Sequence, residues 1–214
     1  MRLKKNPCQN WKLYVITDFD AIGGRSIESV VWQAILGGAD VIQLRHKKAA
    51  DEELVMIARK LLPLTRSKNI PLILNDRVEA ARLIGADGLH LGQDDGSLSE
   101  ARQALGDGVI VGRSTHSPAQ AMAAEKEGFD YIGVGPIFKT PTKPTTTPVG
   151  LDLLRFAAEN VSIPFVAIGG IDEKNVKEVR AAGARTIAVV RAVMGASDPM
   201  AAAKKLKGKM ANEN

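Results

Sequence analysis

The feature that most constrains the fold is an alternation of short apolar runs with longer helical segments, repeated about eight times along 214 residues. The predicted strands are residues 13–17, 41–45, 72–75, 88–91, 109–112, 131–135, 165–168 and 186–190. The predicted helices are residues 27–36, 52–68, 79–84, 99–105, 118–127, 151–159, 175–182 and 199–207. The chain is therefore a repeated strand–helix unit.

Repeated strand–helix units can build either a closed barrel or an open doubly wound sheet. The strands are near-continuous apolar runs, which is typical of a parallel sheet covered by helices. No composition break marks a second domain, and no glycine-rich dinucleotide fingerprint follows the first strand. These observations favour a single (β/α)8 TIM barrel over residues 1–214, with flexible basic ends at about 1–10 and 208–214.

Charge and cysteine content exclude several classes of protein. Lysine and arginine exceed aspartate and glutamate by 29 − 24 = 5, and much of the excess lies at the two ends. No aromatic residues are interleaved with these basic ones, so solvated tails are a better interpretation than nucleic-acid binding, and the excess also suits polyanionic substrates. Cys8 is the only cysteine, which excludes an intrachain disulfide and favours a reducing compartment.

No apolar run approaches the roughly 20 residues that a membrane span needs. Asp18 and Asp20 interrupt the first hydrophobic run, which argues against a signal peptide. The sequence therefore predicts a cytoplasmic protein with small-molecule partners, no nucleic acid and no membrane, and it is compatible with a homo-oligomer.

Polar side chains collect at the carboxyl ends of the predicted strands, where barrels of this kind carry their active sites. Gln43, Arg45 and Lys47 alternate along the end of the second strand, so all three face the barrel interior. An arginine there is costly unless an anion balances its charge. The alternative is an arginine–carboxylate pair across the barrel mouth.

Carboxylates end the third and fourth strands. Asp76 follows the third strand, and Asp94 and Asp95 follow the fourth. Two carboxylates on neighbouring strand ends, together with substrate oxygens, are suited to Mg²⁺. The alternative is that each aspartate caps the helix that follows it, which we prefer for Asp94 but not for Asp76.

Three further strand ends carry groups suited to phosphate oxygens. The long loop after the sixth strand contains Thr140, Thr142 and Lys143 within four residues, and its length is typical of a lid. Gly170 and Arg191 follow the seventh and eighth strands, where such barrels often bind phosphate.

The three histidines lack the spacing of a zinc site. His90 lies within a strand and is expected to be packed, whereas His116 lies on a strand-end loop and is a candidate acid or base. No Ser–His–Asp or Cys–His set is evident, so the predicted chemistry is electrostatic rather than nucleophilic.

Eight motifs in this order closely resemble the thiamine phosphate synthase family. They are LYVITD at 13–18, QLRHK at 43–47, NDR at 75–77, HLGQDD at 90–95, STH at 114–116, GVGPIF at 133–138, TPTK at 140–143 and AIGGI at 167–171. The resemblance runs over roughly residues 13–195 and is highly specific.

The resemblance implies a (β/α)8-barrel transferase that joins 4-amino-2-methyl-5-hydroxymethylpyrimidine diphosphate to 4-methyl-5-(2-phosphoethyl)thiazole, giving thiamine phosphate and pyrophosphate. It implies Mg²⁺ held by Asp76 and Asp95. The residues that it implies for the pyrimidine diphosphate are Gln43, Arg45, Lys47, Asn75, Ser114 and Lys143, with Leu44 and His46 in the same motif. Those for the thiazole phosphate are Thr140, Pro141, Thr142, Gly170, Val190 and Arg191. The catalytic residues among these are Arg45, Lys47, Ser114 and Lys143.

We hypothesise that the pyrimidine C–O bond breaks first, giving a carbocation that the thiazole nitrogen captures. Two positions depart from the family motif: Arg191 stands where the motif has serine, and Arg113 where it has a small apolar residue. Two other functions fit the same barrel. One is the related thiazole tautomerase, in which His116 would matter, and the other is a non-catalytic phosphate-binding regulatory barrel.

Overall fold

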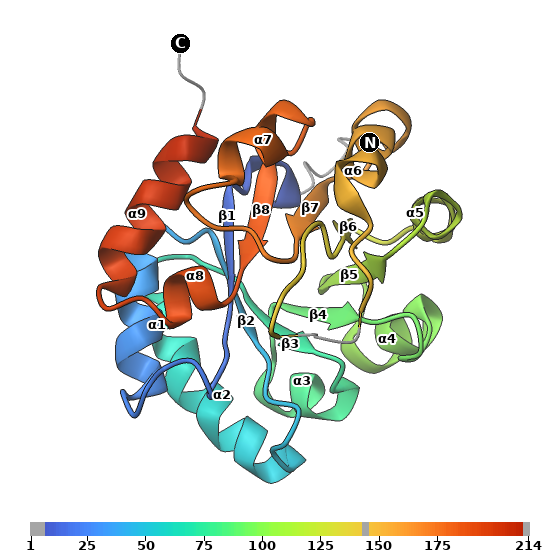
Figure 1. Ribbon diagram of the computed structural model, residues 1–214. Helices are drawn as coiled ribbons and strands as arrows, with labels where there is room; N and C mark the ends of the chain where they lie inside the picture. The colour runs from blue at the N-terminus through green and yellow to red at the C-terminus, as the bar shows by residue number, and fades with distance from the viewer. Residues whose placement is uncertain (1–6, 143–145, 212–214) are drawn as a thin grey trace.

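The computed structural model describes residues 7–142 and 146–211, which form a closed barrel of eight parallel strands ringed by helices (Figure 1). The strands are paired in chain order, and β8 closes the barrel against β1, with Leu13 opposite Ile187. Their bounds are β1 Leu13–Ile16, β2 Val41–Leu44, β3 Leu72–Asn75, β4 Gly88–Leu91, β5 Ile110–Thr115, β6 Tyr131–Val134, β7 Phe165–Ile168 and β8 Thr186–Val189. The predicted (β/α)8 architecture is confirmed.

The helices cover the outside of this sheet, and α9 closes the ring beside α1 (Figure 1). Their bounds are α1 Ile27–Leu36, α2 Asp51–Arg66, α3 Val78–Ile84, α4 Leu98–Leu105, α5 Pro118–Glu127, α6 Gly150–Asn160, α7 Val176–Ala181, α8 Arg191–Met194 and α9 Pro199–Met210. Capping residues in the sequence set where several of these helices begin. Ser97 and Glu100, for example, form a reciprocal capping box at α4.

Two separate apolar layers hold the barrel together. The larger lies between the sheet and the helices, and the smaller fills the barrel interior, where Trp11 packs edge-on against Tyr14 and Tyr131 with ring centroids 5.8 and 5.4 Å away. Glycine at position 112 is required by the interior packing, because a Cβ there would lie 2.2 Å from the Tyr131 ring. The alternation of inward and outward side chains therefore decides which residues can reach the site.

Aspartates preceding three of the even-numbered strands tie the strands together at their amino ends. Asp40 Oδ2 accepts the Lys12 and Leu13 backbone N–H groups at 2.8 and 3.0 Å. Asp87 accepts that of Leu72 at 2.9 Å, and Asp130 that of Val111 at 2.7 Å. These carboxylates fix strand register at the end of the barrel opposite the predicted site.

The strand and helix bounds agree with the sequence predictions except in three places. The fifth strand continues to Thr115, beyond the predicted end at 112, because Ser114 pairs with Gly133 on β6. The short helix α8 was not predicted. The expected flexible ends are partly regular structure, since Pro7–Asn10 forms a 3₁₀ helix and α9 continues to Met210. Residues 1–6 and 212–214 lie outside the described residues.

Candidate active site

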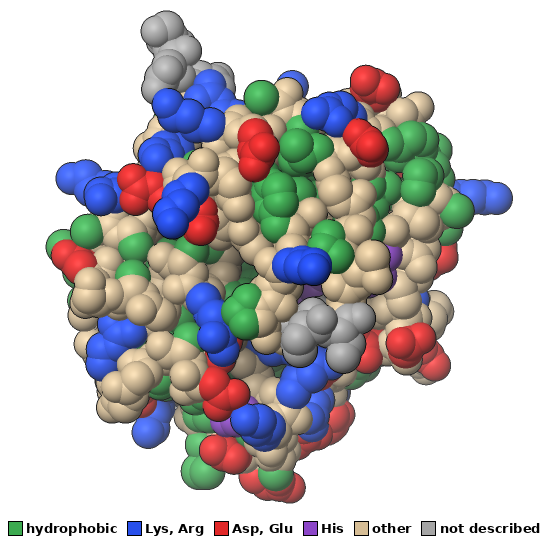
Figure 2. All heavy atoms as spheres, viewed as in Figure 1, with side chains coloured by type: hydrophobic (Ala, Val, Ile, Leu, Met, Phe, Trp, Pro, Cys, Tyr) green, Lys and Arg blue, Asp and Glu red, His purple; other side chains and the backbone are tan. Residues whose placement is uncertain are grey.

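A cavity of about 470 Å³ opens at the carboxyl ends of the strands. Its size lies within the range of small-molecule sites, roughly 300–1,000 Å³. The predicted site residues that line it are Gln43, Arg45, Asn75, Ser114, Thr140, Pro141, Thr142, Gly170, Val190 and Arg191. On the face shown in Figure 2, Lys and Arg side chains gather around the centre of the molecule. The barrel thus brings residues from six strand ends to one cavity.

Other predicted residues do not line the cavity. Leu44 is fully buried between the sheet and the helices, so its side chain is not a substrate contact, because strand alternation turns it away from the interior. His46 stacks on Phe19, with ring centroids 4.2 Å apart. Lys47 lies at the rim, where its Nζ is 3.5 Å from Asp76 Oδ2. Lys143 lies outside the described residues.

Arg45 is available for an anion. Its backbone is clamped to Thr17, whose Oγ1 accepts the Arg45 N–H at 2.9 Å and donates to the Arg45 carbonyl at 3.1 Å. Within residues 7–142 and 146–211, no carboxylate forms an ion pair with its guanidinium. The pair across the barrel mouth that we considered as an alternative is therefore not observed among the described residues. A cation that lines a cavity without a counter-charge is suited to an anionic ligand.

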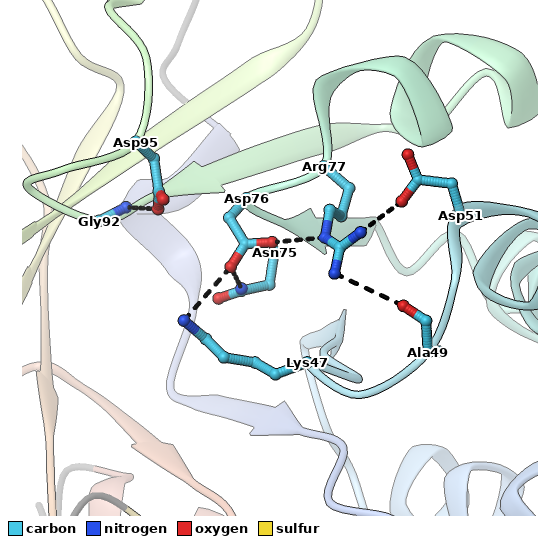
Figure 3. A network of polar contacts seen from close by, with 8 residues as sticks. All are labelled: Lys47, Ala49, Asp51, Asn75, Asp76, Arg77, Gly92 and Asp95. Carbon is cyan, nitrogen blue, oxygen red and sulfur yellow. Dashed lines mark hydrogen bonds and ion pairs between the residues drawn. The ribbon is translucent and has the colours of Figure 1, made fainter.

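Asp76 lies at the centre of a polar network at the ends of β3 and β4 (Figure 3). Its carboxylate accepts from Asn75 Nδ2 at 2.6 Å and from Arg77 Nε at 3.2 Å, and it also faces Lys47. The backbone at Asp76 has a φ of +54°, a left-handed conformation that aspartate tolerates better than most residues. This conformation turns the side chain back over the strand ends, so Asp76 does not cap α3.

Asp95 is held in the next loop along the rim. Its Oδ2 accepts the Gly92 N–H at 2.5 Å, as Figure 3 shows. Among the described residues, no three His, Cys, Asp or Glu side chains come together as metal ligands. Two hard carboxylates on adjacent loops fit a cation such as Mg²⁺ that takes its remaining ligands from water and substrate phosphate.

Arg113 ties down the loop that carries Asp95. Its Nη1 donates to the carbonyls of Asp95 and Gly96 at 3.2 and 2.9 Å, and its Nη2 donates to that of Gln93 at 3.0 Å. The guanidinium also lies 5.5 Å from the centre of the Phe129 ring. The sequence marked this position only as a departure from the family motif. Its contacts make Arg113 a positioning residue for Asp95.

The opposite side of the cavity is suited to a phosphate. Thr142 Oγ1 is a buried hydroxyl without a hydrogen-bond partner among the described residues. Position 170 beside it accepts only glycine, because a Cβ there would lie 2.6 Å from the Lys139 carbonyl oxygen and φ is +64°. Arg191 Nε lies 3.5 Å from Asp18 Oδ2, so its guanidinium is partly neutralised at the rim.

A buried chain of hydrogen bonds crosses the cavity floor. Gln43 Nε2 donates to Tyr14 Oη at 2.8 Å, and Tyr14 Oη lies 2.9 Å from Tyr131 Oη. His90 links Tyr131 to Ser114, with both distances 2.9 Å. Sequence reasoning did not assign Tyr14 or Tyr131 to the site and expected His90 to be only packed. Strand alternation, which points all three inward, is the signal that could have found them.

His116 also lines the cavity. Its Nδ1 donates to the Gly135 carbonyl oxygen at 2.5 Å, which fixes the ring against β6. The predicted acid or base role of His116 stays a prediction. No helix in residues 7–142 and 146–211 has the length and apolar character of a membrane span.

A closed parallel barrel with cations, hydroxyls and two carboxylates around one mouth is the arrangement of a (β/α)8-barrel enzyme. A family model described as thiamine monophosphate synthase matches residues 13–193. The chain therefore belongs to the thiamine monophosphate synthase family. It is an enzyme of thiamine biosynthesis, and its reaction class is transferase.

Individual relatives agree with this assignment. The chain is 48% identical over 199 residues to the thiamine-phosphate synthase of Chloroflexus aurantiacus, covering 92% of each chain. It is 48% identical over 196 residues to that of Pelotomaculum thermopropionicum, covering 91% and 90%. A solved thiamine phosphate pyrophosphorylase from Pyrococcus furiosus superposes with a TM-score of 0.86 at 38% identity, covering 95% and 96%.

Proposed function

We propose that this protein joins 4-amino-2-methyl-5-hydroxymethylpyrimidine diphosphate to 4-methyl-5-(2-phosphoethyl)thiazole, releasing pyrophosphate and forming thiamine phosphate. The observation that carries the proposal is one cavity with two anion-binding groups. Arg45 lies on one side and forms no ion pair among the described residues, and the buried Thr142 hydroxyl, which has no hydrogen-bond partner among those residues, lies on the other. Two phosphorylated substrates require two anion sites facing one reaction space.

The diphosphate would bind at the ends of β2 and β3. Arg45 and Lys47 supply positive charge there, and Lys143, which lies outside the described residues, would add a third cation. Asn75 lines the same wall and already donates to Asp76. Cations aimed at the leaving group stabilise the negative charge that develops on it as the C–O bond breaks.

Mg²⁺ belongs to the same proposal, with Asp76 and Asp95 as its protein ligands. When bound, the ion would neutralise part of the diphosphate charge and so make it a better leaving group. Lys47 and Arg77 hold the Asp76 carboxylate at the rim. Gly92 and Arg113 do the same for Asp95 and its loop.

The thiazole phosphate would bind on the opposite side, against the loops after β6, β7 and β8. Thr140, Thr142 and the Gly170 backbone line that wall, with Val190 and Arg191 beside them. Arg191 would trade its contact with Asp18 for the phosphate, which it can bind in a bidentate way. A fixed phosphate positions the thiazole nitrogen for attack, so orientation supplies part of the rate.

The mechanism that fits these residues is dissociative. The pyrimidine C–O bond breaks first, the 4-amino group of the substrate delocalises the cation, and the thiazole nitrogen then captures it. No protein nucleophile is required, and Cys8 lies in the 3₁₀ helix before β1, outside the cavity lining. Apolar walls formed by Ile16, Val166 and Ile168 would keep water from the cation.

Small-molecule substrates, a cytoplasmic location and the absence of nucleic-acid or membrane partners are parts of the proposal. They are supported by the single cysteine and by the small net charge of +5. A homo-oligomer stays a prediction.

The experiment is pyrophosphate release by the purified protein with the pyrimidine diphosphate and Mg²⁺, with and without the thiazole phosphate. Release that needs both substrates and Mg²⁺, with thiamine phosphate formed in equal amount, is the expected result. Binding of the thiazole phosphate without pyrophosphate release would contradict the proposal and indicate a tautomerase or a regulatory barrel.

A further inference from the structure

The hydrogen-bond chain on the cavity floor connects two of the proposed substrate-binding residues. It runs from Gln43 on β2 through Tyr14 and Tyr131 to His90, and ends at Ser114 on β5. All four links are 2.8–2.9 Å long, which is the length of a good hydrogen bond. Gln43 and Ser114 are therefore coupled through three side chains that no substrate assignment includes.

The two tyrosines carry one proton each at neutral pH. Burial raises the pKa of Tyr14 and of Tyr131 well above the usual tyrosine range. Their exposed fractions are 2% and 1%, so both side chains are almost completely buried at the floor of the cavity. Each phenol can donate one hydrogen bond and must accept the others.

Proton counting sets the direction of the chain. With the Gln43 amide nitrogen donating to Tyr14, the Tyr14 proton is directed to Tyr131, and the Tyr131 proton to His90 Nδ1. If Tyr131 instead donated to Tyr14, the Tyr14 proton would have no acceptor among the described residues, a costly state for a buried hydroxyl. His90 Nδ1 is then an acceptor, so the ring proton is on Nε2 and is donated to Ser114 Oγ.

The ends of the chain then have opposite hydrogen-bonding characters. Ser114 Oγ accepts from His90, which leaves its own proton to be donated into the cavity that it lines. Gln43 uses its nitrogen on Tyr14, which leaves Oε1 as an acceptor at the cavity wall. A ring that presents a donor towards Gln43 and an acceptor towards Ser114 matches both ends.

We propose that this chain of hydrogen bonds makes the cavity floor selective for an aminopyrimidine over the corresponding oxopyrimidine. Tyr14, Tyr131 and His90 are then positioning residues, which orient Gln43 and Ser114. The inference rests on the proposed function, because it concerns the pyrimidine substrate of that site. An exocyclic amino group donates and its neighbouring ring nitrogen accepts. An oxo group with a protonated ring nitrogen has the reverse pattern, and it leaves both Gln43 Oε1 and the Ser114 proton unmatched.

Packing holds the chain in this geometry. Trp11 contacts both tyrosine rings, and the missing side chain at Gly112 leaves the space that the Tyr131 ring fills. A Cβ on Gly133 would lie 3.4 Å from the His90 ring, so the ring also packs closely against β6. Rings held in this way keep the polar atoms of the chain at hydrogen-bonding distance. The direction of the chain is set by the protons on the two hydroxyls and on the histidine ring, whose heavy atoms stay in place.

The first test is the protonation of His90, read by ¹⁵N NMR of the histidine ring in the protein without ligand. The expected result is a neutral ring with the proton on Nε2. Tyr131→Phe, which removes the donor to Nδ1, should convert this signal to a mixture of the two tautomers. A wild-type ring with its proton on Nδ1 would overturn the inference, because Ser114 would then be the donor within the chain.

The second test compares two variants at one position. In His90→Gln the amide nitrogen can occupy the place of Nε2 and still donate to Ser114, whereas in His90→Asn it reaches only the place of Nδ1. We expect wild type and His90→Gln to prefer the amino substrate over its 4-oxo analogue by at least about 100-fold in kcat/KM. His90→Asn should lose roughly tenfold or more of that preference, mainly through a higher KM for the amino substrate.

Both variants need circular dichroism and thermal melts to establish that they are folded. A purely structural role for His90 predicts equal preferences in both variants, and that result would overturn the inference. If the wild type releases no pyrophosphate from either pyrimidine, the proposed function fails, and the NMR measurement still decides the direction of the chain. If the wild type turns over and accepts both pyrimidines equally, the inference alone fails.

Discussion

Replacing Asp76 with glycine should separate the role of Asp76 in cation binding from its contribution to the free energy of unfolding. Asp76 has a φ of +54°, and relieving a non-glycine residue of this conformation is worth about 1 kcal/mol. Against that gain stand the lost hydrogen bond from Asn75, worth about 0.5–1.5 kcal/mol, and two lost ion pairs, to Lys47, whose side chain is 59% exposed, and to Arg77, at 32%. Partly exposed pairs contribute about 0.2–1 kcal/mol each, and Arg77 keeps its contact with Asp51 at 2.5 Å.

The free energy of unfolding should therefore change by no more than about 2 kcal/mol, which corresponds to a Tm shift within roughly 4–8 °C. Cation binding should respond very differently. Loss of one of the two carboxylates should lower the affinity for the cation by more than about 100-fold. Mutation of residues that only orient a metal ligand already lowers metal affinity about 10–100-fold. The assays are pyrophosphate release against Mg²⁺ concentration and direct titration with Mn²⁺, together with a thermal melt.

Asn69→Gly is the matched control. Asn69 is the other non-glycine residue with positive φ among the described residues, at +53°, and it lies between α2 and β3 at the far end of the barrel. This variant should show the same gain in the free energy of unfolding from placing glycine at a positive φ. Its kinetics and cation binding should be unchanged. Wild-type turnover of Asp76→Gly at low Mg²⁺ would refute the metal assignment, and a loss of more than about 3 kcal/mol would refute the stability reasoning.

Three further predictions concern other parts of the molecule. Arg113→Met should raise the Mg²⁺ concentration for half-maximal activity about tenfold, because three carbonyls of the Asp95 loop lose their donor; unchanged Mn²⁺ affinity would contradict this. Asp40→Ala should lower the free energy of unfolding by about 2–3 kcal/mol, because two backbone N–H groups lose their acceptor, and should leave kcat/KM at 25 °C unaltered in steady-state assays. Burial raises the pKa of Cys8, so the folded protein holds the thiol proton more tightly than the unfolded chain, and stability is lost as pH rises above the ordinary value of 9.0. Cys8→Ser should weaken that decline in urea titrations between pH 8 and 10 without changing activity, whereas an identical decline would show that other groups cause it.

Sequence reasoning succeeded where a local signal decides the outcome. Apolar runs and helix-capping residues act within a few positions, so most strands and helices lie where they were predicted. Strand alternation was enough to direct Gln43 and Arg45 into the interior, and both line the cavity. It also explains why Leu44, which was included as part of a continuous motif, faces the helices instead.

Other features depend on barrel closure. β5 extends to Thr115 only because β6 lies beside it, and α8 is too short to carry a periodic signal. The hydroxyls of Tyr14 and Tyr131 meet although the residues are 117 positions apart. Arg113 finds its three carbonyl acceptors in the loop after the neighbouring strand.

Local sequence thus determined the repeated unit, the barrel and the chemical types of groups at its mouth, because those follow from short-range periodicity and from residue chemistry. Only the tertiary structure decided which of these groups touch. The contacts that orient Asp76, Asp95, His90 and Ser114 come from different strands. Their geometry is set by the register of the closed sheet, which no single segment of the chain contains.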